Sequence, residues 1–283
     1  MTREPHDELA LVDQRLWVVV RRTGLAAYDF DFSSCFAIRH PAHVPDPVVA
    51  VARLGAVEDL EAEFALWQRR GVTFINNPEE SRLADDLSKW YPSLADLTPR
   101  SVVFDRLPDA CDVEAAIGWP VFLKGVRQTS RHDASLAIAR SAADYARLSA
   151  RWYDNPILAS QRVAARELAQ LRVVQPAERP DELPRAFEFR TFWWRGEFVA
   201  AGPYWTNAGE YRWSDAERRS ALAVAGEAAR RLNVGFLCVD VAQTTEGKWI
   251  VIEVNDGQRS GYAGVPRIAL WRAVIDAIDR SPL

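Results

Sequence analysis

One segment near the C-terminal end, VDVAQTTEGKWIVIEVNDGQRSGY at residues 239–262, limits what this chain can fold into more than any other. Two runs rich in Val and Ile flank Glu246-Gly247, a pattern typical of a β-hairpin with a two-residue turn. Counting outward from that turn, Asp240 pairs with Glu253. Asn255 shares the face of Glu253, because side chains along a strand alternate with a period of two. Like charges directly opposite each other destabilise a sheet, so this acidic pair needs an explanation.

The acidic pair has two interpretations. Asp240 lies inside FLCVDVA and Glu253 inside IVIEV, so apolar residues flank both, which argues against a polar face that is simply solvated. Hard divalent cations take oxygen ligands, and Mg²⁺ needs only one or two carboxylates when phosphates complete its shell. From the carboxylates alone, a metal site and a solvated surface hairpin are equally good interpretations.

Composition sets the class of protein. The chain has 283 residues, of which 48% are hydrophobic and 26% charged, with a formal net charge of -4. This mix is typical of a globular protein and argues against general nucleic-acid binding. No apolar run reaches membrane-spanning length, and the polar N-terminal stretch does not resemble a signal peptide. The three cysteines are far apart and odd in number, which predicts a cytoplasmic protein without disulfides.

Hydrophobic periodicity predicts alternating strands and helices, the α/β (α+β) class. A hairpin is expected around Arg195-Gly196, and a capping box at Ser214–Glu217 begins a long helix. The expected strands lie at 16–20, 72–77, 101–105, 121–125 and 157–164, and the expected helices lie within 58–72, 112–117, 142–152, 214–233 and 268–278.

The order of these segments resembles the ATP-grasp superfamily of carboxylate–amine and carboxylate–thiol ligases, as a divergent member. The resemblance rests on SKW followed by TP, then GWPVFLKG, ILASQRV, FEFRTF, a long helix, FLCVDVA and IVIEVNDGQRSG, over roughly residues 85–280. It implies two lobes that grip ATP between their sheets, after a small α/β N-terminal domain. The implied units are residues 1–84, residues 85–163 with the small lobe and its linker, and residues 164–283 with the C-terminal lobe and the metal-binding hairpin.

The resemblance assigns the acidic hairpin to metal and the rare lysines to nucleotide. It implies that Asp240, Glu253 and Asn255 hold two Mg²⁺ ions, with Mn²⁺ as an alternative, against the ATP phosphates. Of the 35 basic residues only three are lysine, and a compact ammonium suits a phosphate oxygen. The implied ATP-binding residues are Lys89, Lys124, Gln161, Arg162, Val163 and Glu188. Each lysine alone is also compatible with a surface position, and 161–163 with an ordinary core strand.

Catalysis and substrate binding are implied at neighbouring positions. Arg190 and Glu253 are the expected catalytic residues, because a guanidinium fork and a metal-bridging carboxylate stabilise charge on a transferring phosphoryl group. A cross-strand salt bridge is the alternative for Arg190. The loop after the hairpin is expected to hold substrate through Asp256, Ser260 and Gly261, with a flexible surface turn as the alternative.

One segment departs from the family pattern. Many relatives close a glycine-rich loop over the phosphates after the first lysine strand, whereas this chain has GVRQTSRHDAS with one glycine at 125. Side chains of Arg127, Thr129, Ser130 and Arg131 are the expected replacement donors. The sequence leaves open whether this loop still closes over phosphates.

The expected activity is an ATP-dependent, ADP-forming ligase that joins a small-molecule or peptide carboxylate to an amine through an acyl phosphate. Two alternatives stay open from sequence: a phosphotransferase on the same fold, and a non-catalytic nucleotide-binding protein. The identity of the acid and the amine and the oligomeric state cannot be predicted.

Overall fold

The N-terminal third of the chain forms a five-stranded mixed sheet in the order β3-β1-β2-β4-β5. The computed structural model describes residues 7–41, 47–55, 57, 59–127, 133–179 and 181–280. Strands β2, β4 and β5 are parallel, and β1 pairs antiparallel with both β2 and β3. The elements are β1 (Glu8–Val12), β2 (Leu16–Val20), η1 (Phe32–Ser34), β3 (Ile38–Arg39), β4 (Val48–Arg53), α1 (Leu60–Gln68) and β5 (Val72–Phe74). The strand expected at 16–20 is confirmed.

The middle of the chain forms a separate antiparallel sheet in the order β6-β9-β7-β8. Alternation along β7 turns Leu123 toward a core beneath α4 and α5, whereas Phe122 and Lys124 face the opposite way. The elements are β6 (Ser101–Phe104), α4 (Ala110–Ala116), β7 (Val121–Gly125), η2 (Ala134–Leu136), β8 (Ile138–Ala139), α5 (Ala142–Trp152), α6 (Pro156–Ala159) and β9 (Val163–Glu167).

The strand predicted over 157–164 is wrong in its first half. Residues 156–159 form the short helix α6, and β9 starts only at Val163. The side chain of Asn155 accepts hydrogen bonds from the backbone N–H groups of Ile157 and Leu158, with Pro156 at the first helical position. An Asn cap followed by Pro is a helix-start signal, and here it outweighs the apolar run that suggested a strand.

The C-terminal lobe is built on a four-stranded antiparallel sheet in the order β13-β12-β14-β15. The predicted hairpin at Arg195-Gly196 is confirmed, and both residues have positive φ (48° and 79°), as a tight primed turn requires. The elements are β10 (Val173–Gln175), β11 (Arg185–Ala186), β12 (Glu188–Trp194), β13 (Glu197–Pro203), α7 (Asp215–Leu232), β14 (Phe236–Gln243) and β15 (Trp249–Asp256).

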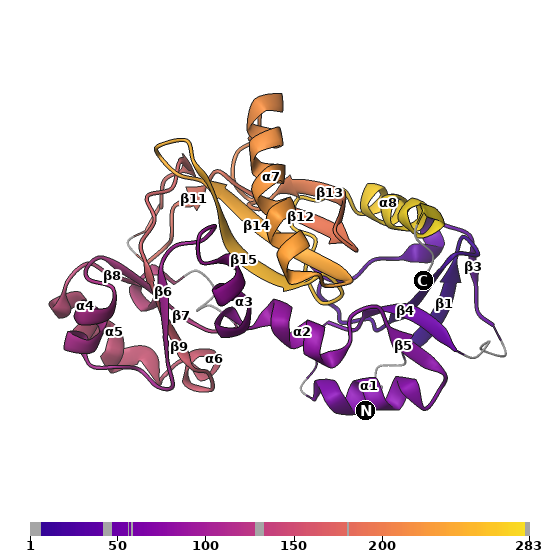
Figure 1. Ribbon diagram of the computed structural model, residues 1–283, viewed down its shortest axis with the longest axis horizontal. Helices are drawn as coiled ribbons and strands as arrows, with labels where there is room; N and C mark the ends of the chain where they lie inside the picture. The colour runs from indigo at the N-terminus through magenta and orange to yellow at the C-terminus, as the bar shows by residue number, and fades with distance from the viewer. Residues whose placement is uncertain are drawn as a thin grey trace.

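Helix α7 covers one face of this sheet and leaves the other face for the site. Its alanines pack with Phe187, Phe189 and Val239 in one core. The capping box predicted at Ser214 and Glu217 is present at the start of α7, and the helix ends at Asn233 in a left-handed conformation. In Figure 1, α7 lies across β14 and β12, and the small lobe with α4 and α5 lies at one end of the molecule.

The N-terminal sheet and the C-terminal lobe share a core. Val12, Leu16 and Val51 pack with Phe236 and with Trp271 of the last helix, α8 (Arg267–Arg280). Two further helices, α2 (Pro78–Asp85) and α3 (Leu87–Leu94), connect the N-terminal sheet to the small lobe. The boundaries at 84 and 163 remain predictions, and the shared core means that residues 1–84 do not bury their apolar surface alone.

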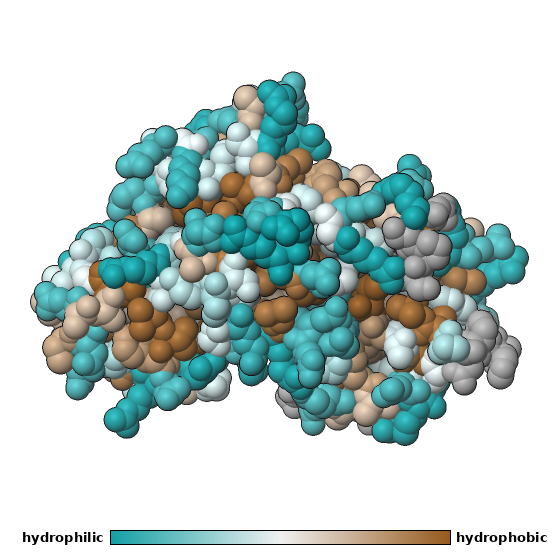
Figure 2. Space-filling view, viewed as in Figure 1, coloured by the Kyte–Doolittle hydropathy of each residue, from teal (hydrophilic) through white to brown (hydrophobic). Residues whose placement is uncertain are grey.

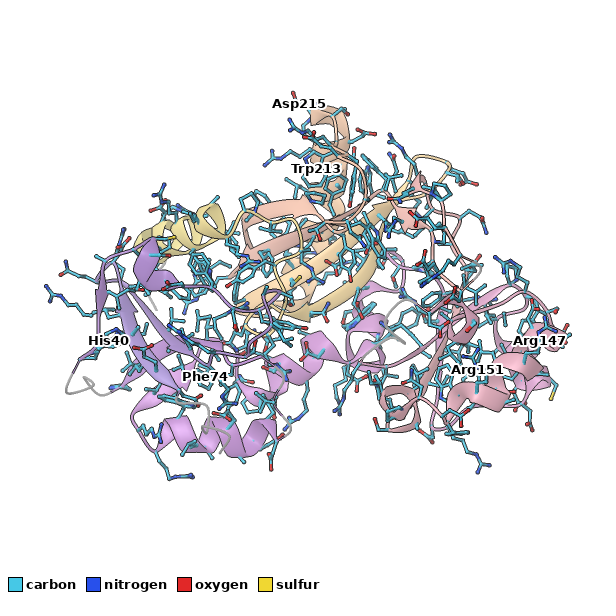
Figure 3. All side chains as sticks on the ribbon, turned by 180° about the vertical axis from the view of Figure 1, so that it is seen from behind. His40, Phe74, Arg147, Arg151, Trp213 and Asp215 are labelled. Carbon is cyan, nitrogen blue, oxygen red and sulfur yellow. The ribbon has the colours of Figure 1, made fainter. Side chains whose placement is uncertain are left out.

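The surface is that of a mixed, patchy globular chain. Figure 2 shows hydrophobic residues in separate patches among hydrophilic ones on this face. Seen from behind, His40 and Phe74 lie at one end of the molecule, Arg147 and Arg151 at the other, and Trp213 and Asp215 at the start of α7 (Figure 3). Within the described residues, no helix combines the length and the apolar character needed to cross a membrane.

Candidate active site

A row of polar residues crosses the C-terminal sheet on the face opposite α7. Arg190 on β12 pairs with Asp240 on β14, and Asp240 pairs with Glu253 on β15. Because directly paired residues share a face, the three side chains project together into the space between the lobes. The predicted pairing of Asp240 with Glu253 is confirmed.

The guanidinium of Arg190 binds both oxygens of Asp240. Its Nε donates to Oδ1 at 2.9 Å and its NH2 to Oδ2 at 2.7 Å, while NH1 donates to the carbonyl of Gly261 at 2.7 Å. Asp240 is fully buried, and burial raises its pKa although Arg190 opposes that effect. The salt bridge offered as the alternative for Arg190 is therefore present, with Asp240 as its partner.

Lys124 reaches across from the small lobe to Glu253. Its Nζ lies 2.5 Å from Oε1 of Glu253, and only 3% of Lys124 is exposed. Burial favours the neutral form of Glu253, but the charge and hydrogen bond of Lys124 outweigh burial and lower its pKa. Glu253 is therefore ionised at neutral pH and held by a cation from the other lobe.

The turn of the hairpin differs from the prediction, and a bulge restores the predicted pairing. Thr244 pairs with Lys248 around a three-residue loop, with Gly247 at a φ of 85°. This register would misplace Glu253 by one residue, but it shifts between Asp240 and Val241, where Ile252 is the extra residue. A bulge re-aims the residues beyond it, and here it returns Glu253 to the face of Asp240.

The side chains of Asp240, Glu253 and Asn255 suit a hard cation in their chemistry. Two carboxylates and an amide oxygen are ligands that Mg²⁺ accepts, and the Asn255 amide makes no hydrogen bond to any residue in the described ranges. Across those ranges no three His, Cys, Asp or Glu side chains gather closely enough to hold a metal by themselves. The donors fit Mg²⁺, provided that Arg190 and Lys124 release some of the oxygens they now hold.

A cavity of about 280 Å³ opens beside this row, between the two lobes. Lys124, Glu188 and Glu253 supply its charged wall, and the backbone segment 168–171 supplies another. Glu188 is buried, and burial raises its pKa well above the usual range, with the charge of Asp240 adding to the effect. Trp205 Nε1 donates to Glu188 at 3.1 Å. A deep pocket with converging polar groups and perturbed pKa values is typical of a ligand site.

Sequence reasoning missed several residues of this cavity. Arg166 is buried, its NH1 donates to the carbonyl of Ile252 at 2.8 Å, and burial lowers its pKa to about 10. Two signals were available: Arg166 alternates with Ala165 on a strand next to Lys124, and the segment 168–171 directly follows that strand. The missed lining residues are Phe122, Ile138, Arg140, Arg166, Leu168, Ala169, Gln170, Leu171, Tyr204, Trp205 and Ile252.

Four predicted ATP-binding residues lie away from the cavity lining. Lys89 is exposed on α3. The backbone of Val163 belongs to ladders with β6 and β7, and the carbonyl of Arg162 accepts from Val126 N at 3.1 Å. The Gln161 side chain accepts from Arg127 N at 2.8 Å. Residues 128–132, with the predicted donors Thr129, Ser130 and Arg131, lie outside the described residues.

The predicted substrate residues are used inside the protein. The fully buried Asp256 carboxylate accepts from Asn76 Nδ2 at 2.7 Å and from Ser81 Oγ at 2.6 Å, both from the N-terminal side of the chain. Ser260 Oγ donates to the carbonyl of Asp256 at 2.7 Å, and the carbonyl of Gly261, not its amide, faces Arg190. This geometry gives Asp256 a structural role at the domain junction.

Comparisons with known proteins agree with the fold. Residues 113–274 match a family described as an ATP-grasp domain, clade family 3. The RimK domain protein ATP-grasp from Sphaerobacter thermophilus DSM 20745 is 18% identical, with a TM-score of 0.55 over 82% of this chain and 81% of that one. The D-alanine–D-alanine ligase from Bacillus anthracis is 12% identical, with a TM-score of 0.56 over 80% of this chain and 74% of that one. Its complex with ATP is similar at 14% identity, with a TM-score of 0.55 over 82% and 79% of the chains. No curated protein matches the sequence significantly.

Proposed function

This chain belongs to the ATP-grasp domain family that its sequence matches, clade family 3, and we propose that it is an ATP-dependent ligase that joins a carboxylate to an amine. One observation carries the proposal: Lys124 of one lobe meets the row of Arg190, Asp240 and Glu253 of the other beside a cavity between the lobes. Four charges drawn from four strands and two lobes cost too much desolvation to be retained for stability alone.

In the proposed reaction the terminal phosphoryl group of ATP passes to a carboxylate oxygen, which gives an acyl phosphate and ADP. An amine then attacks the carbonyl carbon, the carbon–oxygen bond to phosphate breaks, and the amine loses a proton as the amide forms. Arg190 and Lys124 supply fixed positive charge where negative charge develops on phosphoryl oxygens. The reaction requires no covalent nucleophile from the protein.

The residues that would hold Mg²⁺ are Asp240, Glu253 and Asn255. When bound, the ion neutralises charge on the phosphates of the nucleotide. The protein's own contribution is exchange: Lys124 leaves Glu253 for a phosphate oxygen, and Glu253 becomes free to bind a cation. We assign the base of the nucleotide to the segment 168–171 and Arg166, because they line the cavity, and we assign Glu188 to the ribose hydroxyls.

The test is ADP release from ATP and Mg²⁺ in the presence of pooled carboxylic acids and pooled amines. The proposal expects release that requires both pools and an amide product detectable by mass spectrometry. A phosphorylated acid formed without any amine would establish a phosphotransferase instead. Tight nucleotide binding with no ADP release from any pool would indicate a non-catalytic binding protein.

A further inference from the structure

A second and larger cavity, of about 920 Å³, lies on the other side of the segment that follows β15. Its walls come from β2, the loop at 26–34, β4 and residues 262–268. The carbonyl of Gly261 accepts from Arg190, and the next residue, Tyr262, lines this cavity. One stretch of backbone therefore separates the large cavity from the row of charged residues.

Two arginines of the cavity have no acidic partner in the described part of the chain. Arg53 is 5% exposed and donates only to backbone carbonyls, of Gly257, Gln258, Ser260 and Tyr28, and its Nε has no hydrogen-bond partner among the described residues. Arg267 donates only to the carbonyls of Asp29 and Ala26. Both guanidiniums lie over the Tyr262 ring, at 4.6 and 5.0 Å from its centroid. Buried charge without a counter-charge is costly, which favours an anionic ligand here.

The acidic groups of the same cavity are already satisfied. Asp29 accepts hydrogen bonds from the backbone N–H and the hydroxyl of Thr23. Asp31 caps the short helix η1, and Glu8 lies 3.2 Å from His40 at the rim. Because local donors occupy these carboxylates, the charge that remains available to a ligand is positive.

Apolar side chains are unusually exposed at the mouth of this cavity. Ile268 is 43% exposed and lines the cavity, and Leu25, 58% exposed, directly precedes the lining residue Ala26. Phe30 and Ile38 form apolar wall inside. Exposed apolar side chains beside a cationic pocket indicate a ligand that has both an apolar part and an anionic end.

We propose that this cavity binds the non-reacting end of the substrate, and that this end is the free carboxyl terminus of a peptide whose last residue is apolar. The carboxylate meets the positive charge of Arg267 and Arg53, and the apolar side chain packs on Phe30 and Ile268. This inference rests on the proposed ligase function, since the other end of the peptide reaches the charged row past Tyr262.

The experiment is equilibrium dialysis of the full chain against a pool of dipeptides with apolar C-terminal residues and a matched pool of their C-terminal amides. Retained dipeptides are identified by mass spectrometry, and binding of a non-hydrolysable ATP analogue is measured on the same samples. We expect retention of the free dipeptides with an affinity about tenfold or more above that of the amides, since a charge-assisted hydrogen bond is lost in the amide.

Three variants connect this retention to the cavity. Arg267→Gln removes the charge but keeps a donor for the loop carbonyls, and it should weaken retention about tenfold. Ile268→Glu places a negative charge at an exposed position that is safe for folding, and it should also weaken retention, while Ile268→Lys should not. Equal retention of both pools, retention of neither, or indifference of retention to Ile268→Glu would overturn the proposal. Retained dipeptides without nucleotide binding would instead overturn the ligase function and leave the cavity assignment standing.

Discussion

Glu253 and Asp256 are buried carboxylates three positions apart on one strand, and they are held in opposite ways. Glu253 faces the cleft and is held by a cation from the other lobe. Asp256 faces the N-terminal sheet and is held by neutral donors aimed at its two oxygens, from Asn76 and Ser81. Neutral donors fixed around a carboxylate cement a junction, whereas a cation that can exchange partners leaves the carboxylate available. The comparison therefore separates a structural acid from a candidate catalytic acid.

The largest effect should come from Asp256. Asp256→Ala leaves the donors of Asn76, Ser81 and the Gln258 backbone N–H buried without acceptors, which should lower the free energy of unfolding by about 3–5 kcal/mol. Chemical denaturation measures the change. Ser260→Ala is the control, because the Ser260 hydroxyl bonds only the Asp256 carbonyl and should cost about 1 kcal/mol. A similar loss in both variants would contradict the junction role of the carboxylate.

A pH effect should follow from Asp85, which accepts from the Asp256 backbone N–H at 2.8 Å and pairs with Arg259. Burial raises its pKa from 3.8 to about 6; Arg259 opposes this and Asp256 adds to it. A raised pKa means that the folded state binds the proton more tightly, so this stabilisation is complete below pH 3.8 and is lost as the pH rises through 6. Relative to Asp85→Asn, the unfolding free energy of the wild-type protein should fall by roughly 3 kcal/mol between about pH 4 and 7. Parallel stability curves for the two proteins would refute the assignment.

Glu253 should affect turnover and not stability. Glu253→Gln keeps an acceptor for Lys124, so the free energy of unfolding should stay within about 1 kcal/mol of the wild-type value. Loss of the negative charge should lower ATP turnover about a hundredfold or more, because a charge that positions the metal and phosphates is removed. Initial rates of ADP release, once an active acid and amine are known, provide the measurement. Wild-type rates in Glu253→Gln would remove the carboxylate from the site.

The smallest expected effect concerns the two lysines on either side of the comparison. Lys124→Gln should weaken binding of an ATP analogue by about tenfold, since a point charge on a phosphate oxygen is lost. Lys248→Gln provides a matched control, because Lys248 is exposed beside the hairpin turn and should bind the analogue as the wild-type protein does. Equal affinities in the two variants would show that Lys124 has no part in nucleotide binding.

Local signals in the sequence predicted much of the fold. The strand at 16–20, the primed turn at Arg195-Gly196 and the cap at Ser214 depend on a few adjacent residues, and all are confirmed. The ATP-grasp resemblance and its α/β class are confirmed as well. The pairing of Asp240 with Glu253 was predicted from a two-residue turn that the chain does not form, and it holds only because a bulge at Ile252 compensates.

What the sequence could not predict depends on contacts between distant segments. Asp256 follows the hairpin acids closely, and only the approach of Asn76 and Ser81, which are 180 and 175 positions away, shows that its carboxylate is used internally. Similarly, the strand β9 starts later than the apolar run suggests, which places 168–171 and not 161–163 at the cavity. Neither contact leaves a periodic pattern in the chain.

The most direct test of the central claim is calorimetric titration of the protein with a non-hydrolysable ATP analogue, with and without Mg²⁺. If Lys124, Arg190, Asp240 and Glu253 form a nucleotide site, the analogue should bind, and Mg²⁺ should strengthen its binding in the wild-type protein but not in Glu253→Gln. Absence of binding under both conditions, or affinities that ignore the metal, would contradict the account.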